Sequence, residues 1–156
     1  MTITVEEKLI MKRVGVYFLA VVMAYLLAVI FISICNMGFL SDMAVSLPPL
    51  SKQLSVIGQD MLGMAPMLLL LVSIALLLAW LFTGQILGRI LRTNVWFYAL
   101  AGFTGMVAIH LIPYSIFGIS LVAATRTFSG LALQGIAGAL AGWFFYQFAF
   151  EANNDR

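Results

Sequence analysis

The only histidine of the chain, His110, lies in an otherwise apolar stretch, where an imidazole could titrate or bind a ligand. Gln134 lies in the next apolar stretch, which should run antiparallel to the first because a short connector joins them. At helical rise, His110 would lie roughly 10 Å and Gln134 roughly 7 Å from the same membrane surface. We therefore expect these two side chains to share a depth.

Three further polar residues are expected near this pair. Tyr114 lies one helical turn beyond His110, and Arg126 and Asp60 belong to connectors on the same side of the expected helices. One interpretation is a structural hydrogen bond between helices, which is common among polar side chains in membranes. The other is an outward-facing polar pocket that binds a small ligand or a lipid head group, formed by His110, Gln134, Tyr114, Arg126 and Asp60.

The remaining polar residues do not have the spacing of a catalytic or metal site. No Asp, Glu, Lys or Arg falls within a predicted span, whereas ion-coupled transporters and proton pumps usually carry one there. One histidine and one cysteine, Cys35, are too few for a metal cluster, a bis-histidine haem or an internal disulfide. We therefore predict no catalytic residues, no metal and no cofactor. Because no basic stripe is present, we also expect no nucleic-acid partner.

Composition places these residues in a membrane. Of the 156 residues, 63% are hydrophobic and 9% are charged, and the mean hydropathy is +1.10. A soluble domain commonly carries about 25% charged residues. The charges leave four uncharged intervals, each longer than the roughly 20 residues that cross a bilayer. The predicted fold is an all-α integral membrane protein, a single four-transmembrane-helix bundle with spans at about 14–37, 64–88, 95–117 and 129–150.

The loop between the first two spans carries a further pattern. The segment of about 48–62 begins with a pair of prolines and repeats apolar side chains on one helical face, namely Leu50, Leu54, Ile57 and Met61. This pattern predicts a short amphipathic helix in the first external loop, lying on the membrane or capping the bundle. The alternatives are an ordinary connector, a lid over a ligand, or a helix that docks a partner.

Glycines mark the expected helix contacts. In the fourth span, Gly138 and Gly142 form a GxxxG pair, and Gly135 lies nearly one turn earlier. The third span carries Gly102 and Gly105. Small residues let helix backbones approach closely in a bilayer. The sequence predicts packing through these five glycines, either inside one monomer or between subunits.

Basic residues predict the orientation, because they are enriched on the cytoplasmic side of membranes. With cytoplasmic termini, six lie inside and two outside. The inner residues are Lys8, Lys12, Arg13, Arg89, Arg92 and Arg156, and the outer ones are Lys52 and Arg126. The format of a small four-span protein with cytoplasmic ends resembles many bacterial inner-membrane proteins, which implies that location.

Three functions are compatible with these features. The leading hypothesis is a small polytopic membrane protein that acts by helix packing, as a homo-oligomer or as an accessory subunit of a larger membrane complex, surrounded by lipids. The first alternative is a small-solute channel or transporter with the outward-facing pocket at His110 and Gln134. The second is a lipid-modifying membrane enzyme that uses His110 as a base.

Overall fold

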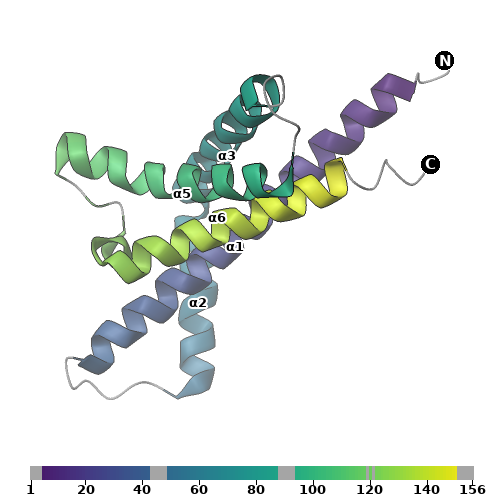
Figure 1. Cartoon of the computed structure of the whole chain (residues 1–156). Coiled ribbons are helices and arrows are strands. Elements are labelled where there is room, and N and C mark those ends of the chain that lie inside the picture. Colours follow the sequence, from purple (N-terminus) through teal and green to yellow (C-terminus); the bar gives the residue numbers. More distant parts are fainter. Residues whose placement is uncertain (1–4, 43–48, 88–93, 119, 121, 151–156) are drawn as a thin grey trace.

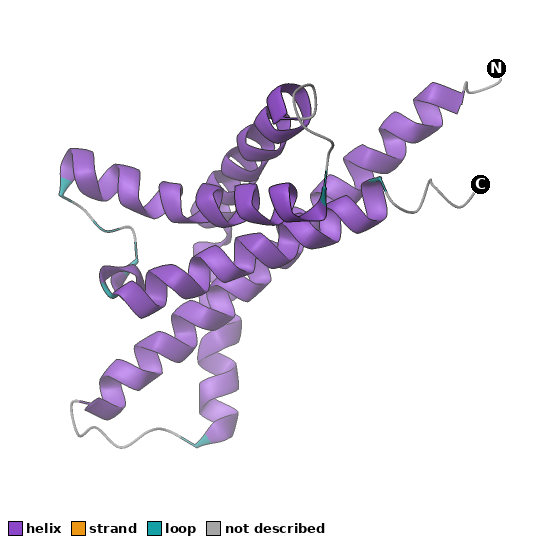
Figure 2. Ribbon diagram, viewed as in Figure 1, coloured by secondary structure: helices purple, strands orange, loops and turns teal. Residues whose placement is uncertain are grey.

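The structure is a computed structural model that describes residues 5–42, 49–87, 94–118, 120 and 122–150, and nearly all of these are helical (Figure 2). Within them, four helical runs are long and apolar enough to cross a membrane: Val5–Phe39, Leu50–Ile86, Val95–Phe117 and Phe128–Ala149. This confirms the predicted all-helical class and the predicted number of helices with the length and composition of a membrane span.

Helix α6 (Phe128–Ala149) occupies the middle of the bundle, between α5 (Val95–Phe117) and α1 (Val5–Asp42) (Figure 1). Helix α3 (Leu70–Phe82) packs against α5 and α1. The start of α1 and the end of α6 lie at one end of the bundle, which we call the terminal end. The link from α5 to α6 lies at the opposite end, which we call the connector end.

Helix α1 is much longer than a bilayer crossing requires. Its 38 residues extend about 57 Å at 1.5 Å per residue, against roughly 30 Å of hydrocarbon. It therefore joins the charged head of the chain and the first predicted span in one helix. Ala20, Ala24 and Ala28 are fully buried along it. These small side chains allow α6 to pack close to α1.

The second helical run differs from the prediction. Helix α2 (Leu50–Met64), predicted as a separate external helix at about 48–62, continues directly through a π-helical turn, η1 (Ala65–Leu69), into α3 and a second such turn, η2 (Thr83–Leu87). Pro66 lies at the start of η1. A π-helical turn accommodates the missing N–H and the bulk of a proline, so the helix is not interrupted there.

Helix α2 packs on α1 through polar as well as apolar atoms. The Ser33 hydroxyl donates to the Asp60 carboxylate at 2.7 Å, and the Tyr25 hydroxyl donates to the backbone carbonyl of Met61. Leu50 and Leu54, which belong to the predicted apolar face, remain 70% and 61% exposed. Only the second half of α2 therefore packs on α1.

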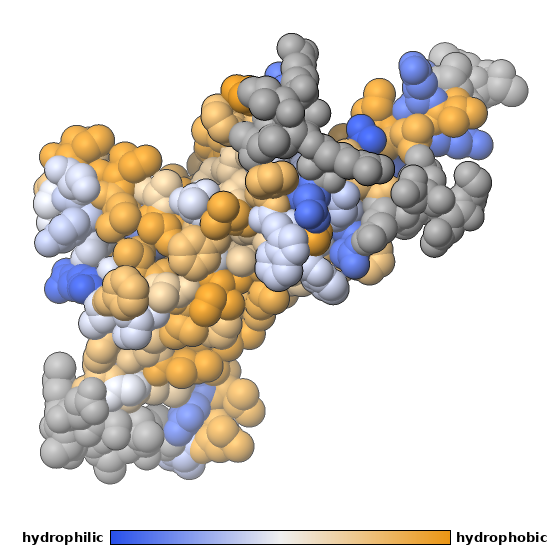
Figure 3. All heavy atoms as spheres, in the orientation of Figure 1, coloured by the Kyte–Doolittle hydropathy of each residue, from blue (hydrophilic) through white to orange (hydrophobic). Residues whose placement is uncertain are grey.

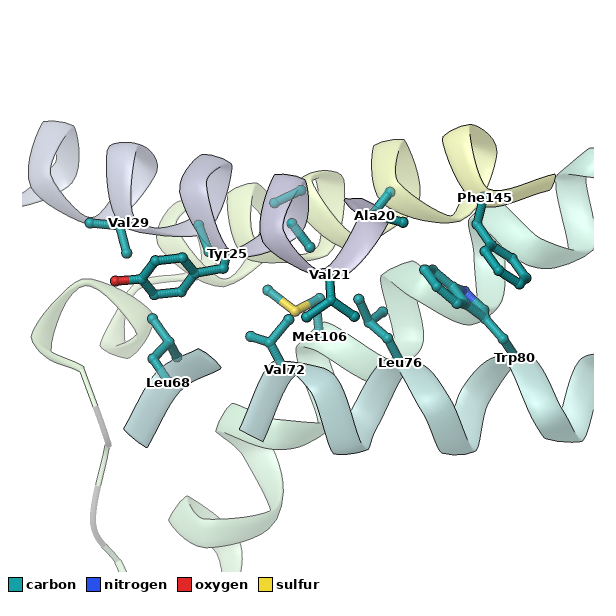
Figure 4. Packing of buried hydrophobic residues seen from close by; sticks show 14 of the residues in the cluster. Ala20, Val21, Tyr25, Val29, Leu68, Val72, Leu76, Trp80, Met106 and Phe145 are labelled. Atoms are coloured by element: carbon teal, nitrogen blue, oxygen red, sulfur yellow. The ribbon is translucent and has the colours of Figure 1, made fainter. Parts of the chain in front are cut away.

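The core lies where α1, α3 and α5 meet beside α6. Figure 4 shows Val21, Val72, Leu76 and Met106 directed toward one another, and all four are buried. Outside this core the middle of the visible face is apolar, while hydrophilic residues gather toward the ends of the helices (Figure 3). That distribution suits a chain whose middle is surrounded by hydrocarbon.

Candidate ligand-binding site

A pocket of about 410 Å³ opens at the connector end, between the end of α5 and the start of α6. Helix α5 stops at Gly118, whose φ of 66° is the left-handed conformation that glycine adopts without strain. The chain then forms a 3₁₀ turn, η3 (Ala123–Arg126), before α6 begins. The lining residues are His110, Leu111, Tyr114, Gly118, Ser120, Thr125, Arg126, Thr127, Phe128 and Leu131.

Hydroxyl groups fix the wall on the connector side. Thr127 is the N-cap of α6, and its Oγ1 accepts from the Gly130 amide at 3.2 Å while donating to the Ala124 carbonyl at 3.0 Å. Thr125 donates to the Val122 carbonyl at 2.8 Å. The first turn of α6 is therefore held as part of the pocket wall, and a helix N-terminus carries a partial positive charge.

Arg126 supplies the formal charge of the pocket. Its side chain is exposed, and its Nε donates to Ser120 Oγ at 2.7 Å. Among the described residues that line the pocket, none is Asp or Glu. The pocket therefore has a positive electrostatic potential, from a guanidinium and a helix N-terminus together.

His110 forms the deepest polar part of this wall. The side chain is 3% exposed, and neither Nδ1 nor Nε2 has a hydrogen-bond partner among the described residues. Gln134 lies beside the ring but forms no hydrogen bond of normal geometry with it. Buried polar groups are normally satisfied, and each one left without a partner costs about 1–3 kcal/mol. The imidazole is thus positioned to gain a hydrogen bond.

Gln134 connects the pocket to α1. Its Nε2 donates to the backbone carbonyl of Ala28 at 3.0 Å, its side chain is 1% exposed, and its Oε1 has no partner in the described part of the chain. The amide therefore spans the interface between α6 and α1 directly behind His110. Sequence reasoning did not reveal the Ala28 carbonyl, because only the position of α6 between α1 and α5 brings it there.

The structure brings together four of the five residues predicted for the pocket and leaves one apart. His110, Tyr114 and Arg126 line the cavity, and Gln134 lies behind it. Asp60 is not among the lining residues, because α2 packs on α1 and its carboxylate accepts from Ser33. The hydroxyls of the connector were not predicted as part of the site, although a threonine directly before an apolar helix is a recognisable N-cap signal.

Glycines bring α5 and α6 into direct backbone contact farther along the two helices. A Cβ added at Gly102 would lie 2.1 Å from the Gly138 carbonyl oxygen, and one at Gly142 would lie 2.1 Å from the Tyr98 carbonyl oxygen. Gly135 is covered by the Phe103 ring, at 2.4 Å from such an atom. These contacts all join α6 to α5 inside the monomer, and we call them the glycine seam.

The fifth predicted glycine has a different partner. Gly105 faces α3, where an added Cβ would lie 3.3 Å from the Ala79 Cβ and 3.4 Å from the Ala75 carbonyl oxygen. An apolar groove of about 470 Å³ runs along this contact. We call this groove, which includes the contact of Gly105 with α3, the alanine groove.

No protein-family model, no curated protein and no solved structure matches this chain, so its function is argued from its own geometry.

Proposed function

We propose that this multi-pass membrane protein binds a phosphate-type oxyanion in the pocket at the connector end. The observation that carries the proposal is His110, a nearly fully buried imidazole at the pocket wall whose two nitrogens both lack partners among the described residues. Less than 1 Å² of either nitrogen is accessible. We infer that the ring rotates about its Cβ–Cγ bond when the ligand binds.

The charges of the pocket select an anion. Arg126 offers guanidinium donors that match the oxygens of a phosphate group, and charge-assisted hydrogen bonds of this kind are among the strongest in proteins. The first turn of α6 adds backbone amides, a setting in which proteins often hold phosphate. The hydroxyls of Ser120 and Tyr114 can complete the coordination of the remaining oxygens.

The packing below the pocket favours a protein that binds its ligand over one that lets a solute pass through the membrane. A small-solute channel or transporter between α5 and α6 would need a polar path toward the terminal end. Along that path the backbones of Gly102 and Gly138 touch, and Met106 is fully buried beside them. A solute could pass only if the glycine seam separated, which would break close packing along both helices.

The proposal is tested by binding of inorganic phosphate to the protein in nanodiscs of a zwitterionic lipid, measured by calorimetry. Arg126→Gln should weaken binding at least about tenfold, the loss expected for one charge-assisted contact. Lys52→Gln is the matched control, because Lys52 is an exposed cation outside the pocket lining, and it should change binding less than about twofold. Equal binding by both variants would contradict the proposal.

Adding an anionic phospholipid to the nanodiscs identifies the source of the anion. If the lipid displaces phosphate, the ligand is a head group, and if phosphate binding is unchanged, the ligand is a soluble anion. Failure of both to bind the native protein rejects the pocket as an oxyanion site.

A second candidate is the predicted role as a homo-oligomer or an accessory subunit. The specific observation in its favour is the alanine groove, which is apolar and lined by small residues at Ala75, Ala79, Gly105 and Ala108. The glycine seam is already occupied within the monomer, so an interaction through helix packing would use the groove. Native mass measurement in nanodiscs tests this role: a single monomeric species would remove the homo-oligomer.

The remaining parts of the proposal concern orientation and location. We propose a bacterial inner-membrane protein with cytoplasmic termini, because of the distribution of basic residues and because the start of α1 and the end of α6 lie at one end of the bundle. Cysteines introduced singly at Lys52 and at Glu6 should then be labelled from opposite sides of intact cells. The alternative of a lipid-modifying enzyme has less support, since no described carboxylate contacts His110 to orient it as a base.

A further inference from the structure

A second pocket lies at the terminal end, away from the proposed oxyanion site. Its volume is about 290 Å³, and most of its wall is apolar or aromatic. The lining residues are Arg13, Val14, Tyr17, Leu77, Trp80, Leu81, Gly84, Gln85, Tyr98, Phe145 and Phe150. The pocket therefore brings together side chains from α1, α3, η2, α5 and the end of α6, and Arg13 is its one formal charge.

Arg13 packs against an aromatic ring at the edge of this pocket. Its guanidinium lies 4.6 Å above the centre of the Phe150 ring. A cation over an aromatic face is held in place by the ring, and it keeps its charge available for an anion. At the end of a membrane helix, such an arginine is within reach of lipid phosphates.

Trp80 presents an unused hydrogen-bond donor in the same pocket. The side chain is 4% exposed, its ring stacks on Phe145 at 4.4 Å with an interplanar angle of 7° (Figure 4), and its Nε1 has no partner in the described residues. Tyr17 meets the ring edge-on at 6.0 Å, but its hydroxyl already donates to the Ser73 carbonyl. The indole N–H is thus a donor without a described partner, but less than 1 Å² of the nitrogen is accessible. It can reach a ligand only if the ring shifts toward the pocket.

The outer wall of the pocket faces the region where lipid tails would lie. Leu77 and Leu81 of α3 are 43% and 47% exposed. The wall of this pocket therefore combines a cation, an indole, and an apolar surface open toward the hydrocarbon. An amphiphile with a negative head group and ester-linked chains has groups that match each of the three.

We propose that the terminal-end pocket is a selective site for one anionic phospholipid of the adjacent leaflet. The phosphate binds the Arg13 guanidinium, and an acyl chain lies along Leu77 and Leu81. The Trp80 ring shifts toward the pocket on binding, so that an ester carbonyl accepts from Nε1. Because the two pockets lie at opposite ends and share no lining residue, this proposal can be tested independently of the oxyanion site.

The test uses Trp80 as the reporter. In a variant carrying Trp96→Phe and Trp143→Phe, both at exposed positions, Trp80 is the only tryptophan left. The protein is placed in phosphatidylcholine vesicles in which either a minor fraction of phosphatidylglycerol or the same fraction of phosphatidylcholine has brominated chains. We expect brominated phosphatidylglycerol to be preferred over brominated phosphatidylcholine in the quenching of Trp80 by about fivefold. This is the effect expected from the attraction of one basic residue to an anionic lipid.

Substitution of the arginine separates a specific site from general attraction to an anionic surface. Arg13→Gln should abolish the preference, Arg13→Lys should retain most of it, and Lys12→Gln, which changes the neighbouring exposed cation, should leave it within about twofold. Equal quenching by the two brominated lipids would overturn the proposal, because it would reduce the site to ordinary boundary lipid. An unchanged preference in Arg13→Gln would overturn it as well.

The indole N–H is tested by counting retained lipids with native mass spectrometry. Trp80→Phe preserves a ring that can stack on Phe145 and removes only the donor. In the otherwise native chain, it should release bound phosphatidylglycerol more easily than the native protein does. Equal retention by a folded Trp80→Phe protein would contradict the assigned hydrogen bond.

Discussion

Helix α5 makes two glycine contacts, three residues apart, and they differ sharply in closeness. At Gly102, in the glycine seam, an added methyl group would lie 2.1 Å from a backbone carbonyl oxygen of α6. At Gly105, in the alanine groove, it would lie 3.3 Å from the side chain of Ala79 on α3. The first distance is impossible without moving a helix, whereas the second requires a shift of a few tenths of an ångström.

The difference shows which interface holds the bundle together. Direct backbone contact along α5 and α6 maximises dispersion, which is a main source of helix association when lipid replaces water. The contact with α3 leaves a groove and allows adjustment. The glycine seam therefore fixes how α5 and α6 lie against each other, whereas the contact between α5 and α3 is less closely packed.

The largest expected effect comes from breaking the seam. Gly102→Ala should lower the free energy of unfolding by about 3 kcal/mol, because the new methyl group meets backbone that cannot rotate away. A denaturant titration of the detergent-solubilised protein, followed by helix content, measures the change. Gly58→Ala is the control: nothing lies within 4 Å of its added Cβ, so that variant should be as stable as the native protein or slightly more stable. If Gly102→Ala and Gly58→Ala proved equally stable, the glycine seam would not be too closely packed to accept a methyl group, and the comparison would fail.

An intermediate effect is expected at the polar link behind the pocket. Gln134→Met keeps most of the side-chain volume and loses the hydrogen bond to the Ala28 carbonyl, so stability should fall by about 0.6–1 kcal/mol. His110→Leu removes two unpartnered nitrogens and should be neutral or stabilising in the same titration. If His110→Leu proved the more damaging of the two, the ring would have a structural partner and the pocket hypothesis would lose its main support.

The smallest effect belongs to the alanine groove. Gly105→Ala should change stability by less than about 0.5 kcal/mol, because closer packing against Ala79 is balanced by the better helix propensity of alanine. Thermal unfolding of Gly102→Ala and Gly105→Ala measured side by side provides the sharpest comparison. A Gly105 variant as unstable as the Gly102 variant would show that α3 is fixed as tightly as α6.

Much of this arrangement could be predicted from the sequence. Uncharged intervals indicated the helices, and α5 runs from Val95 to Phe117 as expected. The proximity of His110 and Gln134 was expected from helical rise and the antiparallel helices. Such features depend on local composition, which the membrane makes unusually informative.

Other features depend on which helices become neighbours, and the sequence does not contain that information in local form. Gly102 and Gly105 have similar sequence surroundings, but a helix turns about 100° per residue, so they face different partners. Asp60 was assigned to the pocket because it shares a side of the membrane, whereas Ser33 on α1 binds it. The continuity of α2 and α3 was missed because Pro66 usually marks a boundary, and here a π-helical turn accommodates it.

The most direct test of the oxyanion site uses the fact that His110 is the only histidine. Selective ¹⁵N labelling of histidine gives one pair of imidazole signals, which report hydrogen bonding at Nδ1 and Nε2 in nanodiscs. Adding inorganic phosphate should shift at least one signal in the native protein and leave both unchanged in Arg126→Gln. Signals that stay unchanged in the native protein while phosphate binds would contradict the account, because the ligand would then lie elsewhere.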